Sequence, residues 1–282
     1  MASDATGKVS FDHIYAQSDP RAYFSTLRKL DYCIPQLAKP YFLALSNQYR
    51  QAQQVRQLTI LDVGCSYGIN AALMKCEATM DELSERYDGR AVDSGTRESM
   101  LARDRRWTRV RERSTCARFV GLDSSLPALS YALAAGFIDD AVHADLEERE
   151  LTDPERGRLA STGLVISTGC VGYIGTRTIA QLASAGERRP WMAHFVLRMF
   201  PFEALAECLA EMGYETVRSE GLFRQRRFAS AQEQARVLDA LSSVGVDPRG
   251  LEADGWLYTQ LHVSRPREPN SRAVVDLPGS WT

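Results

Sequence analysis

The sequence predicts an α/β fold in which helices cover both faces of a doubly wound parallel sheet. Short apolar runs typical of buried strands alternate with helical patterns between Leu58 and about Val263. The first run, L-T-I-L-D-V-G, ends in glycine and continues through a glycine-rich turn into a helix. In open sheets of this kind, ligands bind outside the carboxyl ends of the strands.

Length and composition fit this fold. The 282 residues are 44% hydrophobic and 25% charged, which suits one large α/β domain with additions or two small domains. The 34 Lys and Arg residues nearly balance the 36 Asp and Glu residues, which argues against a protein whose main task is to hold nucleic acid. No apolar stretch is long enough for a secretory signal or a membrane span, so we expect a cytoplasmic protein without membrane contact.

The spacing of cysteine and histidine does not predict a metal site. No two of the six cysteines form a C-x-x-C pair, and we expect them to be reduced and mostly buried. The four histidines are scattered and lack paired spacing with carboxylates. We therefore expect no metal cofactor.

The first 55 residues are rich in aromatic side chains and contain three prolines. Tyr23, Leu27 and Leu30 recur at helical spacing, which favours several short helices over strands. The pair Asp19-Pro20 is typical of a helix start, with the aspartate as N-cap and the proline at the first helical position. We expect this segment to be helical and distinct from the sheet domain.

The remaining elements follow from the same patterns. Residues 56–265 are expected to form the sheet domain, with a charged helical insertion at about 77–117 between the first helix and the second strand. Residues 266–282 are expected to form an irregular tail. Further strands are expected at 118–123, 140–145, 164–167, 193–197, 214–217 and 257–263, and helices at 126–135 and 202–212.

Three aspartates end three successive predicted strands. Asp62 ends the first beside Gly64 and Gly68, where glycine allows a tight turn and a close approach of the backbone to a ligand. Asp123 ends the second strand, where a carboxylate can accept both hydroxyls of a ribose. Asp145 ends the third, where it can accept from an adenine amino group. Each aspartate alone is explained as well by helix capping, but the three together predict a nucleoside site.

The sequence resembles the class I S-adenosylmethionine-dependent methyltransferase superfamily over about residues 58–263. The resemblance rests on L-D-V-G-C-S-Y-G (61–68), G-L-D-S-S (121–125), A-D-L-E (144–147) and V-I-S-T-G-C-V-G-Y-I (165–174). It implies a Rossmann-like sheet of seven strands, with S-adenosylmethionine as cosubstrate or sole substrate. Ser66 replaces the usual middle glycine of the first motif, and the missing G-x-G-x-x-G argues against a nicotinamide enzyme.

Carried over position by position, the resemblance implies a role for each motif residue. Asp123 faces the ribose, and Asp145 with the backbone N–H of Leu146 faces the adenine. Gly64, Cys65 and Gly68 are implied to face the methionine part of the cofactor. Asp62, Ser124 and Ser167 are implied to bind the cofactor as well.

An N-terminal extension in this superfamily often resembles a lid over the cofactor, which implies that role for residues 1–55. Aromatic faces attract a sulfonium cation as they attract an ammonium, and Tyr15 and Tyr23 are the catalytic candidates there. The alternative is that these rings only attach a helical cap to the sheet. Tyr173 is the third catalytic candidate, because it follows the fourth strand on the loop that borders the reacting carbon in relatives.

These features predict methyl transfer to a small-molecule acceptor that is amino-acid-like or belongs to secondary metabolism. The N-P-P-Y signature of nucleic-acid amino methyltransferases is missing, and the basic cluster of Arg224, Arg226 and Arg227 is interpreted as a solvated face. Two alternatives stay open. One is an intramolecular cyclase that converts S-adenosylmethionine into azetidine-2-carboxylate and methylthioadenosine; the other is a non-catalytic module that binds S-adenosylmethionine. We expect no nucleic-acid partner and a monomer or homodimer.

Overall fold

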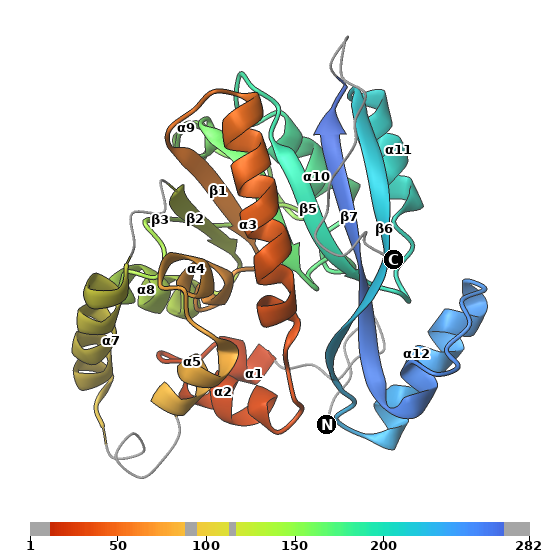
Figure 1. Ribbon diagram of the computed structural model, residues 1–282, viewed down its shortest axis with the longest axis horizontal. Helices are drawn as coiled ribbons and strands as arrows, with labels where there is room; N and C mark the ends of the chain where they lie inside the picture. The colour runs from red at the N-terminus through yellow and green to blue at the C-terminus, as the bar shows by residue number, and fades with distance from the viewer. Residues whose placement is uncertain (1–11, 88–94, 113–116, 268–282) are drawn as a thin grey trace.

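The computed structural model describes residues 12–87, 95–112 and 117–267, and these fold around one sheet of seven strands (Figure 1). Residues 1–11 of the expected N-terminal segment, residues 88–94 and 113–116 of the expected insertion, and residues 268–282 of the expected tail lie outside the described residues. The strand order is β3-β2-β1-β4-β5-β7-β6. The strands are β1 (Leu58–Val63), β2 (Ala117–Asp123), β3 (Asp140–His143), β4 (Thr162–Thr168), β5 (Trp191–Leu197), β6 (Tyr214–Arg227) and β7 (Trp256–Pro266).

Only the last strand departs from the predicted parallel arrangement of the described sheet. β7 runs antiparallel to both of its neighbours, β5 and β6, and the other paired strands are parallel. Antiparallel neighbours need no crossover over the sheet. The predicted doubly wound, Rossmann-like sheet of seven strands is therefore confirmed, with a reversed final strand.

Helices cover both faces of the sheet, which is why β1 and β5 are buried along their whole length. One face carries α3 (Ile34–Ala52), α4 (Ile69–Lys75) and α8 (Leu126–Ala135), and the other carries α9 (Asp153–Leu159), α10 (Thr176–Ala183) and α11 (Glu203–Glu211). Successive residues of β1 serve opposite faces: Ile60 joins the apolar cluster of α3, and Leu61 joins the cluster of α10. This double burial explains the continuous apolar run that predicted β1.

Helices of the N-terminal segment and of the insertion form a separate layer near the carboxyl ends of the strands. They are α1 (Asp12–Tyr15), α2 (Arg21–Arg28), α5 (Met80–Arg86) and α7 (Arg97–Arg111), and Figure 1 shows α1, α2 and α5 gathered below the sheet with α7 at one side. The rings of Phe24 in α2 and Tyr87 after α5 are stacked, with centroids 4.6 Å apart. The N-terminal helices and the insertion are therefore packed together, and we call residues 12–32 the lid.

The longest N-terminal helix does not lie in this layer. α3 packs on the sheet through Phe42, Leu45 and Tyr49, all of which are buried. Of the described residues in the expected lid of residues 1–55, α3 thus packs on the sheet, and residues 12–32 lie over the strand ends. Aromatic residues occur in both parts, so composition alone does not separate them.

The C-terminal part contains elements that the sequence patterns did not indicate. β6 extends far beyond the predicted 214–217, and α12 (Ala231–Ser243) and the 3-10 helix η1 (Glu252–Asp254) precede β7. β6 is an edge strand with many exposed positions, so it lacks the apolar alternation that identifies a strand. Its Arg226 is buried and bonded to Glu233 of α12 at 2.7 Å. The interpretation of the basic cluster as a solvated face is wrong for this residue.

The described residues include five cysteines, all of them free thiols. Cys65 and Cys76 are buried, and Cys116 lies outside the described ranges. None of the described helices has both the length and the apolar character needed to cross a bilayer.

Candidate active site

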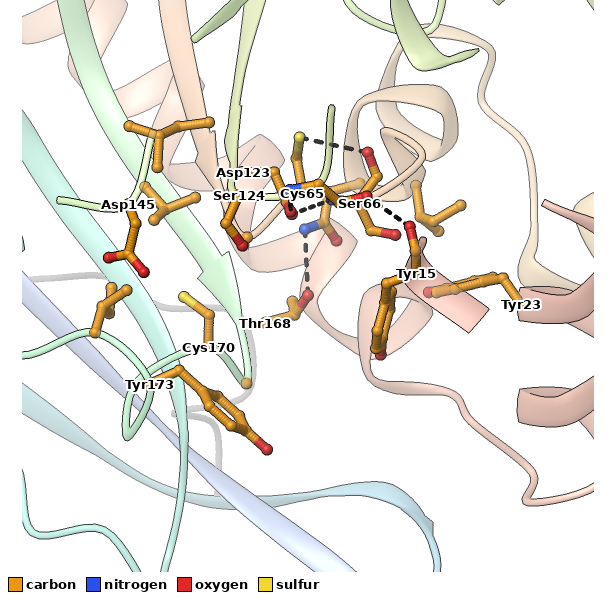
Figure 2. A pocket seen from close by; sticks show the side chains of 18 of the residues that line it. Tyr15, Tyr23, Cys65, Ser66, Asp123, Ser124, Asp145, Thr168, Cys170 and Tyr173 are labelled. Atoms are coloured by element: carbon orange, nitrogen blue, oxygen red, sulfur yellow. Dashed lines mark hydrogen bonds between the residues drawn. The ribbon is translucent and has the colours of Figure 1, made fainter. Parts of the chain in front are cut away.

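A cavity of about 640 Å³ lies at the carboxyl ends of β1 to β4 (Figure 2). The lid forms one side of it, and the loop after β4 with two residues of β6 forms another. Its volume falls in the range of small-molecule sites, roughly 300–1,000 Å³. The predicted site residues that line it are Tyr15, Tyr23, Gly64, Cys65, Asp123, Ser124, Asp145, Leu146 and Tyr173.

Asp123 connects the turns that follow β1 and β2. Its Oδ1 accepts from the backbone N–H of Ser125 at 2.8 Å, and its Oδ2 accepts from the backbone N–H of Ser66 at 2.8 Å (Figure 2). Burial raises the pKa of the Asp123 carboxyl, and the backbone donors oppose this rise. Each carboxylate oxygen can accept a further hydrogen bond, so the side chain can still bind two ligand hydroxyls.

The turn after β1 keeps the left-handed backbone conformation typical of glycine, although Ser66 replaces the usual glycine. Ser66 has a φ of 50°, in the left-handed region that costs a residue with a side chain about 1–2 kcal/mol. The hydrogen bond from its N–H to Asp123 offsets part of this cost. Gly64 has a φ of 67°, and a Cβ there would lie 2.8 Å from the Cβ of Cys170. The turn can therefore approach the loop after β4 only with glycine at position 64.

A line of buried polar side chains runs beneath the cavity. Asn70 donates from Nδ2 to Oδ1 of Asp62 at 3.0 Å and to Oγ1 of Thr168 at 3.2 Å. Within the described residues, Oδ2 of Asp62, Oδ1 of Asn70 and Oγ of Ser66 are buried without a hydrogen-bond partner. Burial raises the pKa of the Asp62 carboxyl to about 7. Buried polar atoms normally have partners, so the oxygens of Asn70 and Ser66, two residues that line the cavity, are suited to polar groups of a ligand.

Tyrosines cover the cavity from the lid side. The ring of Tyr23 lies edge-on to the rings of Tyr15, Tyr32 and Tyr67, at centroid distances of 5.8, 6.4 and 5.7 Å. The Tyr67 hydroxyl lies within hydrogen-bond distance of two backbone carbonyls of the lid, at 3.0 and 2.9 Å. Burial raises the pKa of Tyr23 and Tyr32, so both hydroxyls stay protonated. The rings thus attach the lid to the turn after β1, and those of Tyr15 and Tyr23 also line the cavity.

The opposite wall carries Tyr173 and Asp145. Tyr173 is 48% exposed, and Figure 2 shows it across the cavity from Tyr15 and Tyr23. Asp145 accepts through Oδ1 from the backbone N–H of Glu147 at 2.9 Å, as a helix-capping side chain does. Its carboxylate is exposed and keeps further acceptor capacity on the cavity side.

Three residues expected to bind the cofactor do not line the cavity. Gly68 is the residue before α4 and has a φ of 75°, which lets the turn pass into the helix. Asp62 lies beneath the wall and reaches it through Asn70. Ser167 is buried, with its hydroxyl 2.8 Å from Nδ1 of His194 on β5. Because side chains alternate along a strand, the cavity-facing hydroxyl belongs to the next residue, Thr168.

The sequence patterns did not single out Asn70, Thr168 and Gln225, which also line the cavity. Thr168 and Asn70 lie within or beside the motifs, so alternation along β4 and the helical spacing of α4 could have indicated them. Gln225 had no such signal, because the strand predicted at 214–217 ends before it. Within the described ranges, no group of three or more His, Cys, Asp or Glu side chains is arranged to hold a metal ion.

Comparison with known proteins adds structural neighbours only. No family model matches the sequence, and no curated protein matches it significantly. One similar solved structure is a functionally unknown protein from Deinococcus radiodurans R1, with 17% identity, a TM-score of 0.40, and coverage of 78% of this chain and 86% of that one. Another is the plantazolicin methyltransferase BpumL in complex with SAH, with 11% identity, a TM-score of 0.44, and coverage of 90% and 95%.

A third is an S-adenosylmethionine-dependent methyltransferase from Geobacter sulfurreducens in complex with S-adenosyl-L-homocysteine, with 14% identity, a TM-score of 0.35, and coverage of 79% and 90%. The solved structures that the chain resembles include methyltransferases that use S-adenosylmethionine, the class that the sequence motifs predict.

Proposed function

We propose that the chain is an S-adenosylmethionine-dependent methyltransferase that acts on a small-molecule acceptor. The line of acceptor groups along the cavity supports this best. Asp123 offers a carboxylate to ribose hydroxyls, and the unpartnered Oδ1 of Asn70, which lines the cavity above the buried Asp62, offers an acceptor to a ligand ammonium. A nucleoside joined to an amino-acid arm carries both kinds of group at the two ends of one molecule.

The remaining cavity residues fit the same ligand. Asp145 and Leu146 line the part suited to an adenine, and Tyr15 and Tyr23 present aromatic rings, which attract a cation by ~0.5–2 kcal/mol. When bound, S-adenosylmethionine supplies an electrophilic methyl group on a sulfonium. The protein contributes positioning, which accelerates a displacement between two molecules strongly. We assign Tyr173 to the acceptor side, where its hydroxyl orients the acceptor.

The charges of the wall support a small, non-polyanionic acceptor. Among the described lining residues, Arg226 carries the only guanidinium and there is no lysine. Arg226 bonds Glu233 through both terminal nitrogens, at 2.9 and 2.7 Å, so its charge is balanced within the protein. A phosphate backbone requires cations that are available to the ligand, and this wall offers none.

Ring closure is the second candidate, and the buried ring of Tyr23 favours it. Tyr23 is 3% exposed, lines the cavity together with Asn70 and lies close enough to Asp62 for the carboxylate to add to the rise that burial causes in the pKa of Tyr23. There, the deprotonated amine of the methionyl arm attacks Cγ of the same arm, and the electron pair of the Cγ–S bond leaves with sulfur. The products are azetidine-2-carboxylate and methylthioadenosine, with one proton released.

Product analysis separates these candidates. Purified protein is incubated with S-adenosylmethionine, alone and with a panel of small amines, phenols and carboxylic acids, and the products are measured by mass spectrometry. S-adenosylhomocysteine that forms only with an acceptor supports methyl transfer, whereas methylthioadenosine formed from S-adenosylmethionine alone supports ring closure. Calorimetric binding without either product supports a non-catalytic module, and failure to bind S-adenosylmethionine contradicts all three.

Asp123→Asn is expected to weaken S-adenosylmethionine binding about 10- to 100-fold. Asparagine keeps one acceptor oxygen for the turn but loses the charge-assisted bonds to the ribose, which are worth roughly 1.5–3 kcal/mol. Isothermal calorimetry measures the change. Asp140→Asn is the matched control, because Asp140 pairs with Arg118 at 2.6 Å on the same sheet and does not line the cavity. Equal affinities for Asp123→Asn and the wild type would remove Asp123 from the ribose site.

A further inference from the structure

Gln225 lies at an irregular position of β6 and lines the cavity. Arg224 pairs with Tyr258 and Arg226 pairs with the adjacent Leu257, so Gln225 has no opposite residue on β7. Such a bulge redirects side chains that would otherwise alternate between faces. Both Gln225 and Arg226 therefore point inward: they are 4% and 3% exposed, and both line the cavity.

Backbone hydrogen bonds fix this bulge to the end of the lid. The N–H of Cys33, the residue after the lid, donates to the carbonyl of Gln225 at 2.9 Å, and the N–H of Arg227 donates to the carbonyl of Leu30 at 2.7 Å. The charge of Arg226 is balanced by Glu233. The polar group that β6 offers to a ligand is therefore the uncharged carboxamide of Gln225.

The Gln225 carboxamide lies over the loop that follows β4. A Cβ on Gly169 would lie 2.3 Å from its Nε2, so the side chain occupies the space that glycine leaves open. Gly169 follows Thr168, the last member of the polar line from Asp62. Within the described part of the chain, no residue forms a hydrogen bond with the carboxamide of Gln225. Gln225 is thus a nearly buried polar side chain that is aimed into the cavity and available to a ligand.

We infer that Gln225 is a positioning residue that faces the sulfonium methyl group and hydrogen-bonds the nucleophile of the acceptor. This inference rests on the proposed function. The sulfur of S-adenosylmethionine carries three substituents, and Asp123 and the Asp62–Asn70 pair are assigned to the ribose and the methionyl arm. The methyl group then faces the remaining wall, to which Gly169 and Gln225 belong. The acceptor's lone pair forms the bond to this carbon, and the electron pair of the C–S bond leaves with sulfur.

A negative charge introduced at position 225 tests whether this side chain lies near the sulfonium, and the acceptor need not be known. Calorimetry gives the affinities of S-adenosylmethionine and S-adenosylhomocysteine, of which only the first carries the sulfonium charge, near pH 8. We expect Gln225→Glu to raise the preference for S-adenosylmethionine about tenfold or more, because a carboxylate close to a cation inside a protein attracts it strongly. We expect methylthioadenosine, which is uncharged at sulfur, to bind as it does to the wild type.

Gln260→Glu is the matched control. Gln260 lies on β7, donates to the carbonyl of Ser219 at 2.7 Å and does not line the cavity, so the preference should stay at the wild-type value. An unchanged preference in a folded Gln225→Glu protein overturns the role of Gln225 and leaves the proposed function standing. Failure of the wild type to bind S-adenosylmethionine overturns the proposed function, and this inference with it.

A second measurement covers the case in which Gln225→Glu does not fold. Gln225→Leu and Gln260→Leu are each saturated with S-adenosylmethionine labelled with carbon-13 in its methyl group, and the bound methyl resonance is recorded by NMR. We expect the resonance to move in Gln225→Leu and to match the wild type in Gln260→Leu. A resonance that matches the wild type in both variants overturns the inference.

Discussion

Asp104→Ala is expected to lower the free energy of unfolding by about 3–5 kcal/mol, because it removes the acceptor of a buried network. Asp104 in α7 is fully buried and accepts from a guanidinium nitrogen of Arg86 and from the hydroxyls of Tyr87 and Tyr131, each at 2.6 Å. Alanine leaves one partly buried cation and two buried hydroxyls without their acceptor. Urea unfolding followed by circular dichroism measures the loss.

The matched control for this prediction is an exposed ion pair. Asp247 bonds Arg249 at 2.7 Å, with both side chains more than half exposed, so Asp247→Ala is expected to change stability little. Asp104→Asn keeps the size of the side chain and one acceptor oxygen but removes the charge. Its loss of unfolding free energy is expected to lie between those of Asp104→Ala and Asp247→Ala. A loss from Asp104→Ala no larger than that from Asp247→Ala would show that the insertion is not held by this carboxylate.

Asp62→Asn is expected to stabilise the ligand-free protein near pH 8 and to change its stability little near pH 4. Burial raises the pKa of Asp62 to about 7 in the folded chain, against 3.8 for an exposed aspartate. The folded wild type therefore holds a proton that the unfolded chain releases. Its stability falls as the pH rises from about 4 to about 7, by at most roughly 1.4 kcal/mol per pH unit for this group. Asparagine does not ionise and escapes this loss.

The same substitution has the opposite effect on ligand binding under the proposed function. A bound ammonium favours the ionised carboxylate, so Asp62→Asn should bind S-adenosylmethionine more weakly than the wild type near pH 8. Urea unfolding at several pH values and calorimetry at pH 8 measure the two effects separately. A difference in stability between the two proteins that does not vary with pH would contradict the assignment of the proton to Asp62.

The parts of the fold that could be predicted from sequence are those whose signals are local. α8 spans the predicted residues, because Ser125 caps it and Gly136 ends it in a left-handed conformation. β1 could be predicted because burial on both faces requires an apolar run. The start of β6 could be predicted at 214–217, but the rest of β6 could not, because only its pairing with β7 makes it a strand and that pairing joins residues far apart in the sequence.

The residues of the candidate site also differ in whether the sequence alone could predict them. Motif residues at strand ends, such as Asp123 and Asp145, could be placed because a parallel sheet brings these ends together. Ser167 could not be distinguished from Thr168, because a shift of one residue reverses the face of the side chain. Gln225 needed the bulge in β6 as well, and a bulge depends on the pairing of two strands rather than on either sequence alone.

The place of β7 between β5 and β6 has a consequence for synthesis of the chain on the ribosome. β6 has β7 as its sole neighbour in the sheet of the described residues, so β6 cannot dock until the later strand has emerged. The turn after β1, which holds Gly64 and Ser66, is by then long translated. A nascent chain halted before residue 256 therefore lacks the part of the cavity wall that Gln225 and Arg226 form, and ligand can stabilise the complete site only after β7 has been translated.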